Sequence, residues 1–317
     1  MGATGKGVHL NQPLSNIAIA YRPENMIADQ ICPIVPVDKQ SDNYYIWQIA
    51  DAFRITDDKR APATEANVLD RNISSGTYFA DNYALKDRIP YEDIENADAG
   101  FMFTERTSRV EFLKDRLMLN MEYRVAKQCT SGSNVGSYSA CASAWTDYTN
   151  SDPILDIETA IANVEDATGT RPNSILFGRK VWRHFRKHDD VLSRIFGYQT
   201  TNNGRVVTSE NVKALFELER VLIGGAYQNT AGRGQTASLS GLWADHVLVY
   251  YAPMTPRKDK PSFMYGFRWN KIMNMQAFIY QLPKSHAEEV ELGYYQDEVI
   301  TASALGFLIL NCTSSTA

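Results

Sequence analysis

The chain has few cysteines and no long apolar run. Its four cysteines, at positions 32, 129, 141 and 312, are scattered and form no CxxC pair. This spacing excludes a disulfide framework and gives no zinc or thioredoxin-type signal, so we expect small buried side chains. The longest apolar stretch, residues 302–310, is half of the roughly 18 residues that a membrane-spanning helix needs. The N-terminus lacks the apolar segment of a secretory signal, so we expect no membrane partner and synthesis in the cytoplasm.

Positive charge is also scarce. The 317 residues carry 32 Lys and Arg against 37 Asp and Glu, a formal net charge of −5. Because tight binding of nucleic acid needs phosphate neutralisation by Lys and Arg, this composition predicts only weak, non-specific contact with DNA. Apolar residues make up 44% of the chain, as in globular proteins, and the length allows a core that needs no metal or disulfide.

Catalytic and cofactor motifs are missing as well. The N-terminal GATGKG lacks P-loop spacing, and no GxSxG or strand-following GxGxxG occurs. His184 and His188 stand four residues apart on an expected helix, but Arg183, Arg186 and Lys187 would repel a cation, so we expect a solvated basic face. We therefore predict no catalytic, cofactor-binding or metal-binding residues and no cofactor. An α/β enzyme with an unrecognised site is the alternative from another class.

The first 40 or so residues show no helical or strand period. Four prolines break regular elements, yet the segment is rich in apolar side chains. Such an extended arm needs a surface to lie on. Because the expected core elements begin only after residue 40, we expect that surface to belong to a neighbouring subunit. The candidate interface residues of the arm are Leu10, Leu14, Ile17, Ile19, Tyr21 and Ile27.

An extended hairpin is expected next. Residues 43–55 and 75–89 are rich in aromatic and β-branched side chains and predict two strands, joined by a long polar stretch of mixed charge. The tip of this hairpin is too polar to fold onto its own core. Its candidate interface residues are Asp57, Asp58, Lys59, Arg60 and Glu65.

The strongest helical pattern begins after Asp98, a candidate N-cap, and runs to about Ser131. At 1.5 Å per residue this helix would be roughly 45 Å long and act as a strut. Its expected buried stripe is Val110, Leu113, Leu117 and Met121, widened by Phe112, Leu119 and Tyr123.

An α/β unit is expected over residues 151–272. Asp152 and Pro153 predict the start of a helix and Gly169 its end. Helices over 179–195, continuous or interrupted near Asp189, and from a Ser209 cap to 218, alternate with strands at 174–177, 220–223, 246–251 and 263–269. Residues 288–310 return to strand-like sequence. Together these patterns predict an α+β fold.

Several short motifs occur along the chain in a fixed order, at residues 21–23 (YRP), 36–41 (PVDKQS), 60–62 (RAP), 81–85 (DNYAL), 177–182 (FGRKVW), 221–226 (VLIGGA) and 243–246 (WADH). In their order, and in the order of arm, hairpin, strut helix and α/β unit, the chain resembles the major capsid proteins of tailed double-stranded DNA bacteriophages. The resemblance implies an N-terminal arm (1–42), an extended β-hairpin loop (43–95), a peripheral domain with a spine helix (96–150), an axial α/β domain (151–272) and a return to the peripheral domain (273–317).

The resemblance also implies a function and partners. Pentamers and hexamers of the chain would close an icosahedral head around double-stranded DNA, which places the protein in the virion. A portal protein is an implied partner, and a decoration protein is a further candidate. Because the sequence starts at Met1 with the arm, we expect a separate scaffolding protein rather than a cleaved segment. An encapsulin-like nanocompartment, which packages an enzyme, is the alternative within the same fold.

Overall fold

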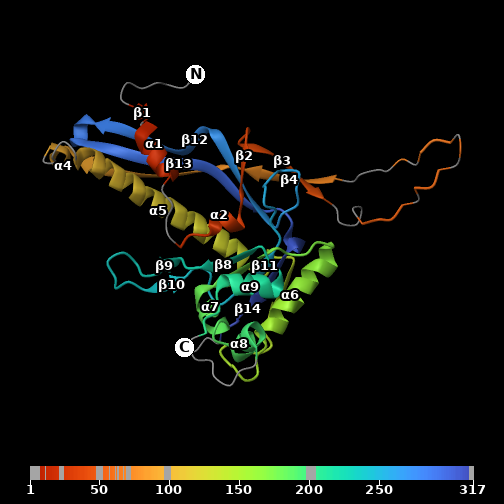
Figure 1. The fold of residues 1–317 in the computed structure, drawn as a ribbon. Coiled ribbons are helices and arrows are strands. Elements are labelled where there is room, and N and C mark those ends of the chain that lie inside the picture. The colour runs from red at the N-terminus through yellow and green to blue at the C-terminus, as the bar shows by residue number, and fades with distance from the viewer. Residues whose placement is uncertain are drawn as a thin grey trace.

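The computed structural model of the chain describes residues 8–10, 12–20, 25–47, 53–56, 58–60, 62, 64–66, 68, 73–95, 101–197 and 205–313. Two mixed sheets and a long helix that connects them form the body (Figure 1). We call them the long sheet and the short sheet. The long sheet has the order β1-β12-β13-β5, and β2 pairs parallel with β12 on the same edge as β1, at Gly266–Trp269. Its strands are β1 (Val8–Leu10), β2 (Ile34–Val37), β5 (Asp81–Pro90), β12 (Met264–Leu282) and β13 (Ala287–Ile300).

The strut helix α5 (Phe101–Cys129) runs along one face of the long sheet (Figure 1). Val110, Leu113, Leu117 and Met121 are all at most 3% exposed, which confirms the expected buried stripe. Phe112 and Tyr123, expected to widen it, are instead 49% and 42% exposed. The stripe drifts around the helix to Val125 and Cys129, because 3.6 residues per turn do not repeat at a constant spacing of four. The expected cap, Asp98, lies outside the described residues.

Ion pairs fix α5 to the long sheet near both of its ends. The Arg106 guanidinium donates to both carboxylate oxygens of Glu288, and the Arg124 guanidinium does the same with Glu298. Glu289, the neighbour of Glu288 on β13, pairs instead with side chains of β5. The two adjacent carboxylates therefore point to opposite faces of the strand, as expected for a pleated backbone.

The short sheet has the order β6-β14-β11-β7-β8. Its strands are β6 (Ser137–Ala140), β7 (Ser174–Gly178), β8 (Arg220–Gly224), β11 (Val247–Tyr250) and β14 (Gly306–Leu310). On one face, Ile175 and Phe177 pack against α6 (Pro153–Thr168), α7 (Arg179–Phe185), α8 (Asp189–Phe196) and α9 (Ser209–Phe216). On the other face, Leu176 and Leu248 pack against the C-terminal part of α5.

The α/β unit follows most of its expected boundaries. The Asp152 side chain accepts from the backbone N–H groups of Ile154 and Leu155, and Gly169 ends α6 with φ +63°, so both helix signals are confirmed. The expected break near Asp189 separates α7 from α8. The cap of α9 is Thr208 and not Ser209, because the Thr208 hydroxyl accepts from the N–H of Asn211 in a capping box.

Two expectations about the tail need correction. β12 begins at Met264 and continues past residue 272, although its pairing with β13 shifts register between Trp269 and Gln276, so the chain enters the long sheet before the expected boundary. The segment 273–317 returns to the long sheet only as far as β13, since β14 lies between β6 and β11 in the short sheet. Residues 306–309 are buried because both faces of that sheet are covered. The division of the chain into domains stays a prediction.

The expected hairpin is present, with a different second strand. β3 (Ser41–Trp47) pairs antiparallel with β4 (Ile73–Phe79). The stretch expected as a single strand over 75–89 is divided at Ala80, where β4 leaves its pairing with β3 and β5 begins its pairing with β13. The same segment thus belongs to the hairpin at one end and to the long sheet at the other.

Candidate assembly surfaces

The base of the β3–β4 hairpin is clamped onto the long sheet by aromatic stacking. Tyr44 of β3 and Tyr78 of β4 stack on Phe267 of β12, with ring centroids 5.3 and 4.6 Å apart. The backbone N–H of Phe79 donates to the carboxylate of Asp297 on β13 at 2.9 Å. These contacts fix the direction in which the connection between the two strands leaves the body.

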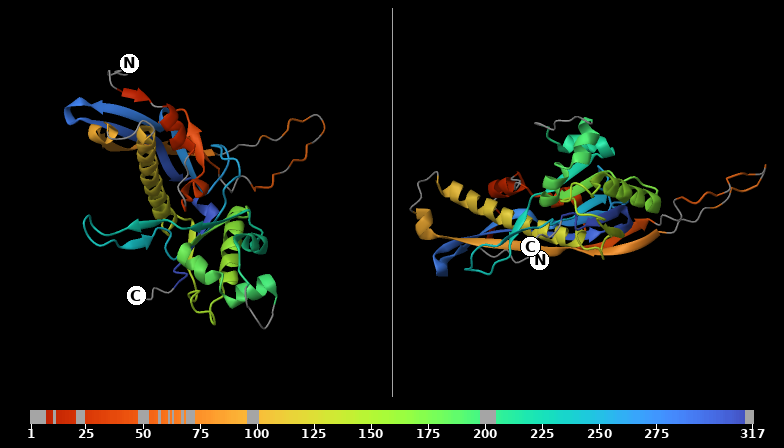
Figure 2. Two further views of the ribbon diagram at one scale, coloured as in Figure 1. Left: turned by 60° about the vertical axis from the view of Figure 1, so that its left-hand side comes forward. Right: turned by 90° about the horizontal axis from the view of Figure 1, so that it is seen from below.

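The described residues of that connection extend away from both sheets (Figures 1 and 2). Of the charged residues predicted for an interface, Asp58, Lys59, Arg60 and Glu65 are all exposed here. Asp57 lies outside the described residues. The structure therefore places four of the five on a projecting segment that faces solvent.

The projecting connection also exposes apolar side chains that sequence reasoning missed. Ile55 is 98% exposed and Val68 is 87% exposed. Their signal in the sequence is two aliphatic residues inside a charged stretch that has no strand or helix period. Phe53, at the foot of the connection, packs its ring over Gly169 at the end of α6, where a Cβ atom would come within 2.5 Å of the ring.

The expectation for the N-terminal arm is wrong: the arm contains a helix, and that helix packs on its own chain. We expected a segment without regular elements that lies on a neighbouring subunit. Instead, residues 12–20 form α1, and Leu14 is 0% exposed in the core between α1, α5 and β12 of its own chain. Pro13 does not break α1 because it stands in the first turn, where its missing N–H is not needed. Leu14, Ile17 and Ala18 then share one face of the helix.

The other arm candidates are also placed within the subunit where the structure describes them. Leu10 pairs with Phe278 as part of β1, and Ile19 belongs to α1. Ile27 is 8% exposed in the core around the end of α5. Tyr21 lies outside the described residues. The arm and hairpin candidates therefore do not form one site: the arm supplies core, and the hairpin supplies exposed surface.

A buried carboxylate joins the arm, the strut helix and the α/β unit. Glu122 of α5 is 0% exposed. Its Oε2 accepts from the N–H groups of Ile27 and Ala28 at the start of α2 (Ala28–Ile31), at 3.0 and 2.7 Å, and its Oε1 accepts from the indole N–H of Trp243 at 2.6 Å. Burial raises the pKa of Glu122 to about 7, although the bonds from Trp243, Ala28 and Ile27 lower it. Sequence reasoning did not identify this contact.

A second hairpin projects from the α/β unit on the side away from α6 (Figure 2). β9 (Tyr227–Asn229) pairs with β10 (Leu239–Gly241), and a polar loop connects the two strands. Leu239 is 69% exposed and Tyr227 is 46% exposed. Like the β3–β4 connection, this hairpin exposes apolar side chains away from the body.

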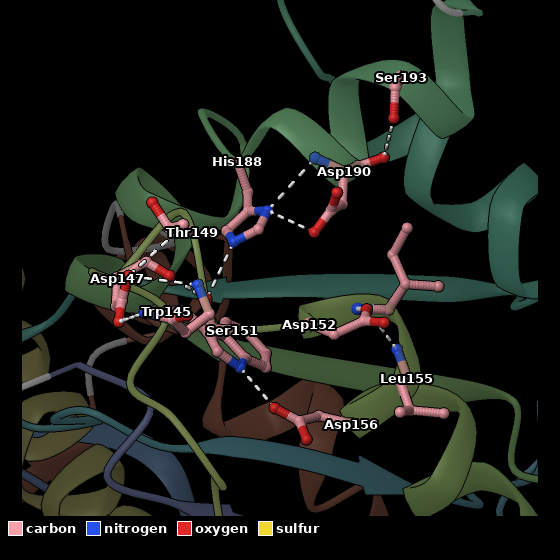
Figure 3. A network of polar contacts seen from close by, with 12 residues as sticks. Trp145, Asp147, Thr149, Ser151, Asp152, Leu155, Asp156, His188, Asp190 and Ser193 are labelled. Atoms are coloured by element: carbon pink, nitrogen blue, oxygen red, sulfur yellow. Dashed lines mark hydrogen bonds and ion pairs between the residues drawn. The ribbon is translucent and has the colours of Figure 1, made fainter.

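His188 is a buried structural residue, whereas Arg183, Arg186 and Lys187 around it are exposed, as expected for a solvated basic face. His188 is 0% exposed, and its ring lies 2.9 Å from the Ser151 hydroxyl, while its other ring nitrogen accepts from the Asp190 N–H at the start of α8 (Figure 3). His184 contacts the Tyr148 hydroxyl at 2.9 Å. Figure 3 also shows the Trp145 indole donating to Asp156 of α6. The network connects the 145–152 segment to two helices of the α/β unit.

The described residues contain no group of three or more His, Cys, Asp or Glu side chains that could hold a metal ion. Three of the cysteines are buried and one is half-buried, as expected, and burial raises the pKa of the Cys129 thiol far above its ordinary value. A buried thiol of this kind is chemically inert. Within the described part of the chain, no helix has both the length and the apolar character of a membrane span.

Comparison with known proteins identifies what this arrangement resembles. Residues 132–250 match the family model described as Phage major capsid protein E. The chain is 26% identical to the major capsid protein of Pseudomonas phage JBD67 over 96% of its own length and 98% of that protein. The expected resemblance to phage major capsid proteins is confirmed. It also confirms the prediction that the chain is not an enzyme, because these relatives are structural capsid proteins.

Solved structures show the same fold. A phage-related protein from Bordetella bronchiseptica RB50 superposes with a TM-score of 0.76 at 21% identity, covering 97% of this chain and 99% of that protein. The capsid structure of cyanophage P-SCSP1u superposes with a TM-score of 0.56 at 9% identity, covering 92% of this chain and 89% of that protein. The expected α+β capsid fold is therefore confirmed.

Proposed function

We propose that this chain, which is similar in sequence and fold to phage major capsid proteins, assembles into pentamers and hexamers that close an icosahedral head around double-stranded DNA. The observation that carries the proposal is the β3–β4 connection. It leaves the body with Ile55 and Val68 almost fully exposed beside the charges of Asp58 and Arg60. A second copy that covers this segment would bury the apolar side chains and offer partners to the charges.

The charge balance supports the role of a container. At a net charge of −5 the chain has little tendency to bind its DNA tightly, so contact with packaged DNA is weak, salt-sensitive and independent of sequence. A scaffolding protein, a portal protein and a decoration protein are the further partners proposed for such a head. The mature location is the virion, after synthesis in the cytoplasm of the host bacterium.

Electron microscopy of the purified chain tests the proposal. We expect rings of five and six copies and closed shells, alone or with the scaffolding protein of the same phage. Small shells of one size that retain a protein would instead indicate a nanocompartment. Single particles at every concentration, with and without scaffolding protein, would contradict assembly altogether.

A further inference from the structure

One face of α6 is acidic and has no partner among the described residues. Ile157, Ile161 and Val164 pack on the short sheet, while Glu158, Glu165 and Asp166 are exposed on the outer side of the helix. The helix sequence contains no Lys or Arg. Across the described part of the chain, no ion pair joins these three carboxylates to a cation. The outer face of α6 is thus an uncompensated negative surface, which we call the α6 face.

The helix α7 and the turn after it form the opposite kind of surface. Arg179, Lys180, Arg183, Arg186 and Lys187 are all exposed. Lys180 pairs with Asp245 at 3.2 Å, and the other four have no carboxylate partner in the ranges that the structure describes. This positive charge affects a neighbouring residue. Burial lowers the pKa of His184, and the charges of Lys187 and Arg183 lower it further. We call Arg179, Arg183 and Arg186 the α7 face.

The two faces lie on different flanks of the α/β unit. α6 packs over β14 and β11, whereas α7 packs beside β7 and β8, at the other end of the short sheet. Figure 1 draws α6 on the right-hand flank of this unit and α7 on the left. One copy therefore cannot pair its own two faces, but two copies placed side by side can.

The spacing of the charges matches as well. Glu158 and Glu165 are seven residues apart, as are Arg179 and Arg186. At a rise of 1.5 Å per residue, each row covers about 10 Å, so the two rows can meet in register. A ring is built from head-to-tail contacts, in which one flank of each copy meets the other flank of the next. Complementary flanks are what such a contact requires.

We propose that in the rings of five and six copies the α6 face of one copy binds the α7 face of the next. This inference rests on the proposed function, since it assigns residues to the contact that closes its rings. The occupant of each face is a second copy of this chain. The charged side chains of the α6 face are all carboxylates, so this face would repel DNA. A partner whose charge is of one sign could pair with only one of the two faces.

A charge exchange tests the pairing. The variant E158K/E165K/D166K reverses the α6 face, R179E/R183E/R186E reverses the α7 face, and a third variant combines both. Shell yield is measured by sedimentation and electron microscopy, and the melting of each unassembled subunit is measured separately. We expect each single reversal to lower shell yield about tenfold or more, because like charges then face each other. The combined variant should regain most of the yield.

A control reversal with the same change of charge, E92K/D93K/E95K, alters α4 (Tyr91–Glu95) at the far end of the long sheet (Figure 1) and should leave α6–α7 contacts intact. If a reversed subunit does not fold, the neutral variants E158Q/E165Q/D166N and R179Q/R183Q/R186Q replace it. These should weaken assembly and make it less sensitive to salt.

Other outcomes would overturn the pairing. Normal yield from both reversals would mean that the faces do not meet. Lost yield that the combined variant does not regain would assign each face to a different partner. Normal shells from the α7 reversal with weaker retention of DNA would assign that face to the genome. If the unmodified chain forms neither rings nor shells, the proposed function itself fails.

Discussion

The Oε1 atom of Glu122 and the indole nitrogen of Trp243 lie 2.6 Å apart and join the strut helix to the α/β unit. The other carboxylate oxygen accepts from the start of α2, so one side chain connects three separate parts of the subunit. All three bonds stabilise the charged form of Glu122, whereas burial disfavours that form. The balance between them makes the joint sensitive to pH.

The first prediction follows from that balance. The pKa of Glu122 is about 7 in the folded subunit against an ordinary value of 4.5, so the folded state binds the proton more tightly than the unfolded state. This contribution to stability is present below pH 4.5 and is lost as pH rises to about 7, by roughly 3 kcal/mol in all. Urea unfolding of unassembled subunits between pH 5 and 8 measures it.

Two variants isolate the contribution of this group. Glu122→Gln should flatten the pH dependence, since it removes the titrating carboxyl. Trp243→Phe removes a bond to the charged form, so it should raise the pKa of Glu122 further and cost more stability at pH 8 than at pH 5. Equal slopes for the unmodified subunit and Glu122→Gln would show that another group is responsible.

The second prediction concerns the buried stripe of the strut helix. Leu117 is 2% exposed in the core between α5 and the long sheet. Leu117→Asp buries an unpaired charge at a cost of several kcal/mol, which is comparable to the whole stability of a domain. We expect insoluble protein on expression. Phe112→Asp on the same helix, at a position 49% exposed, is the control and should stay soluble.

The third prediction concerns the projecting hairpin. Asp58→Asn combined with Arg60→Gln should lower the stability of assembled shells while the melting temperature of the unassembled subunit barely changes. Exposed charge pairs contribute about 0–1 kcal/mol each, and repetition over many copies makes the sum measurable. The control is Arg257→Gln with Asp259→Asn, an exposed pair at 2.8 Å outside the hairpin. Equal losses in shell and subunit would mean that the tip contacts its own chain.

The fourth prediction concerns the arm. Leu14 is fully buried in its own subunit, so Leu14→Ala should lower the free energy of unfolding of the unassembled subunit by about 2–5 kcal/mol. Asn16→Ala, at an exposed position of the same helix, should have little effect. A chain that starts at Val35 lacks α1 entirely and should not fold normally. If that shortened chain shows native-like circular dichroism, the arm is not needed for folding, and its packing surface would belong to a neighbouring subunit.

The sequence predicted correctly the ends of α6 and the buried stripe of α5, because these features depend on residues close together in the chain. The start of α6 needs only an Asp side chain before a Pro, and its end needs only a Gly that accepts a positive φ. The stripe from Val110 to Met121 needs only helical periodicity. These features are determined by residues within a few positions of each other, and the structure confirms them.

The features that sequence reasoning missed depend on partners far away in the chain. Glu122 looks like an ordinary charged helix residue, and only the distant Ile27 and Trp243 explain its burial. α1 went unrecognised because Pro13 was interpreted as a breaker and not as a first-turn residue. The exposure of Ile55 could not be predicted, because an aliphatic side chain in a polar stretch is compatible with a core contact.

The continuous path from β4 into β5 has a mechanical consequence. The strand that leaves the hairpin at Phe79 is paired with β13 from Asp81 to Pro90. A force that a neighbouring copy exerts on the hairpin would therefore act along the direction of β5. It would shear all ten residue pairs between β5 and β13 together, instead of separating them one after another. On the β4 side of the hairpin, such a load passes directly into the long sheet through β5.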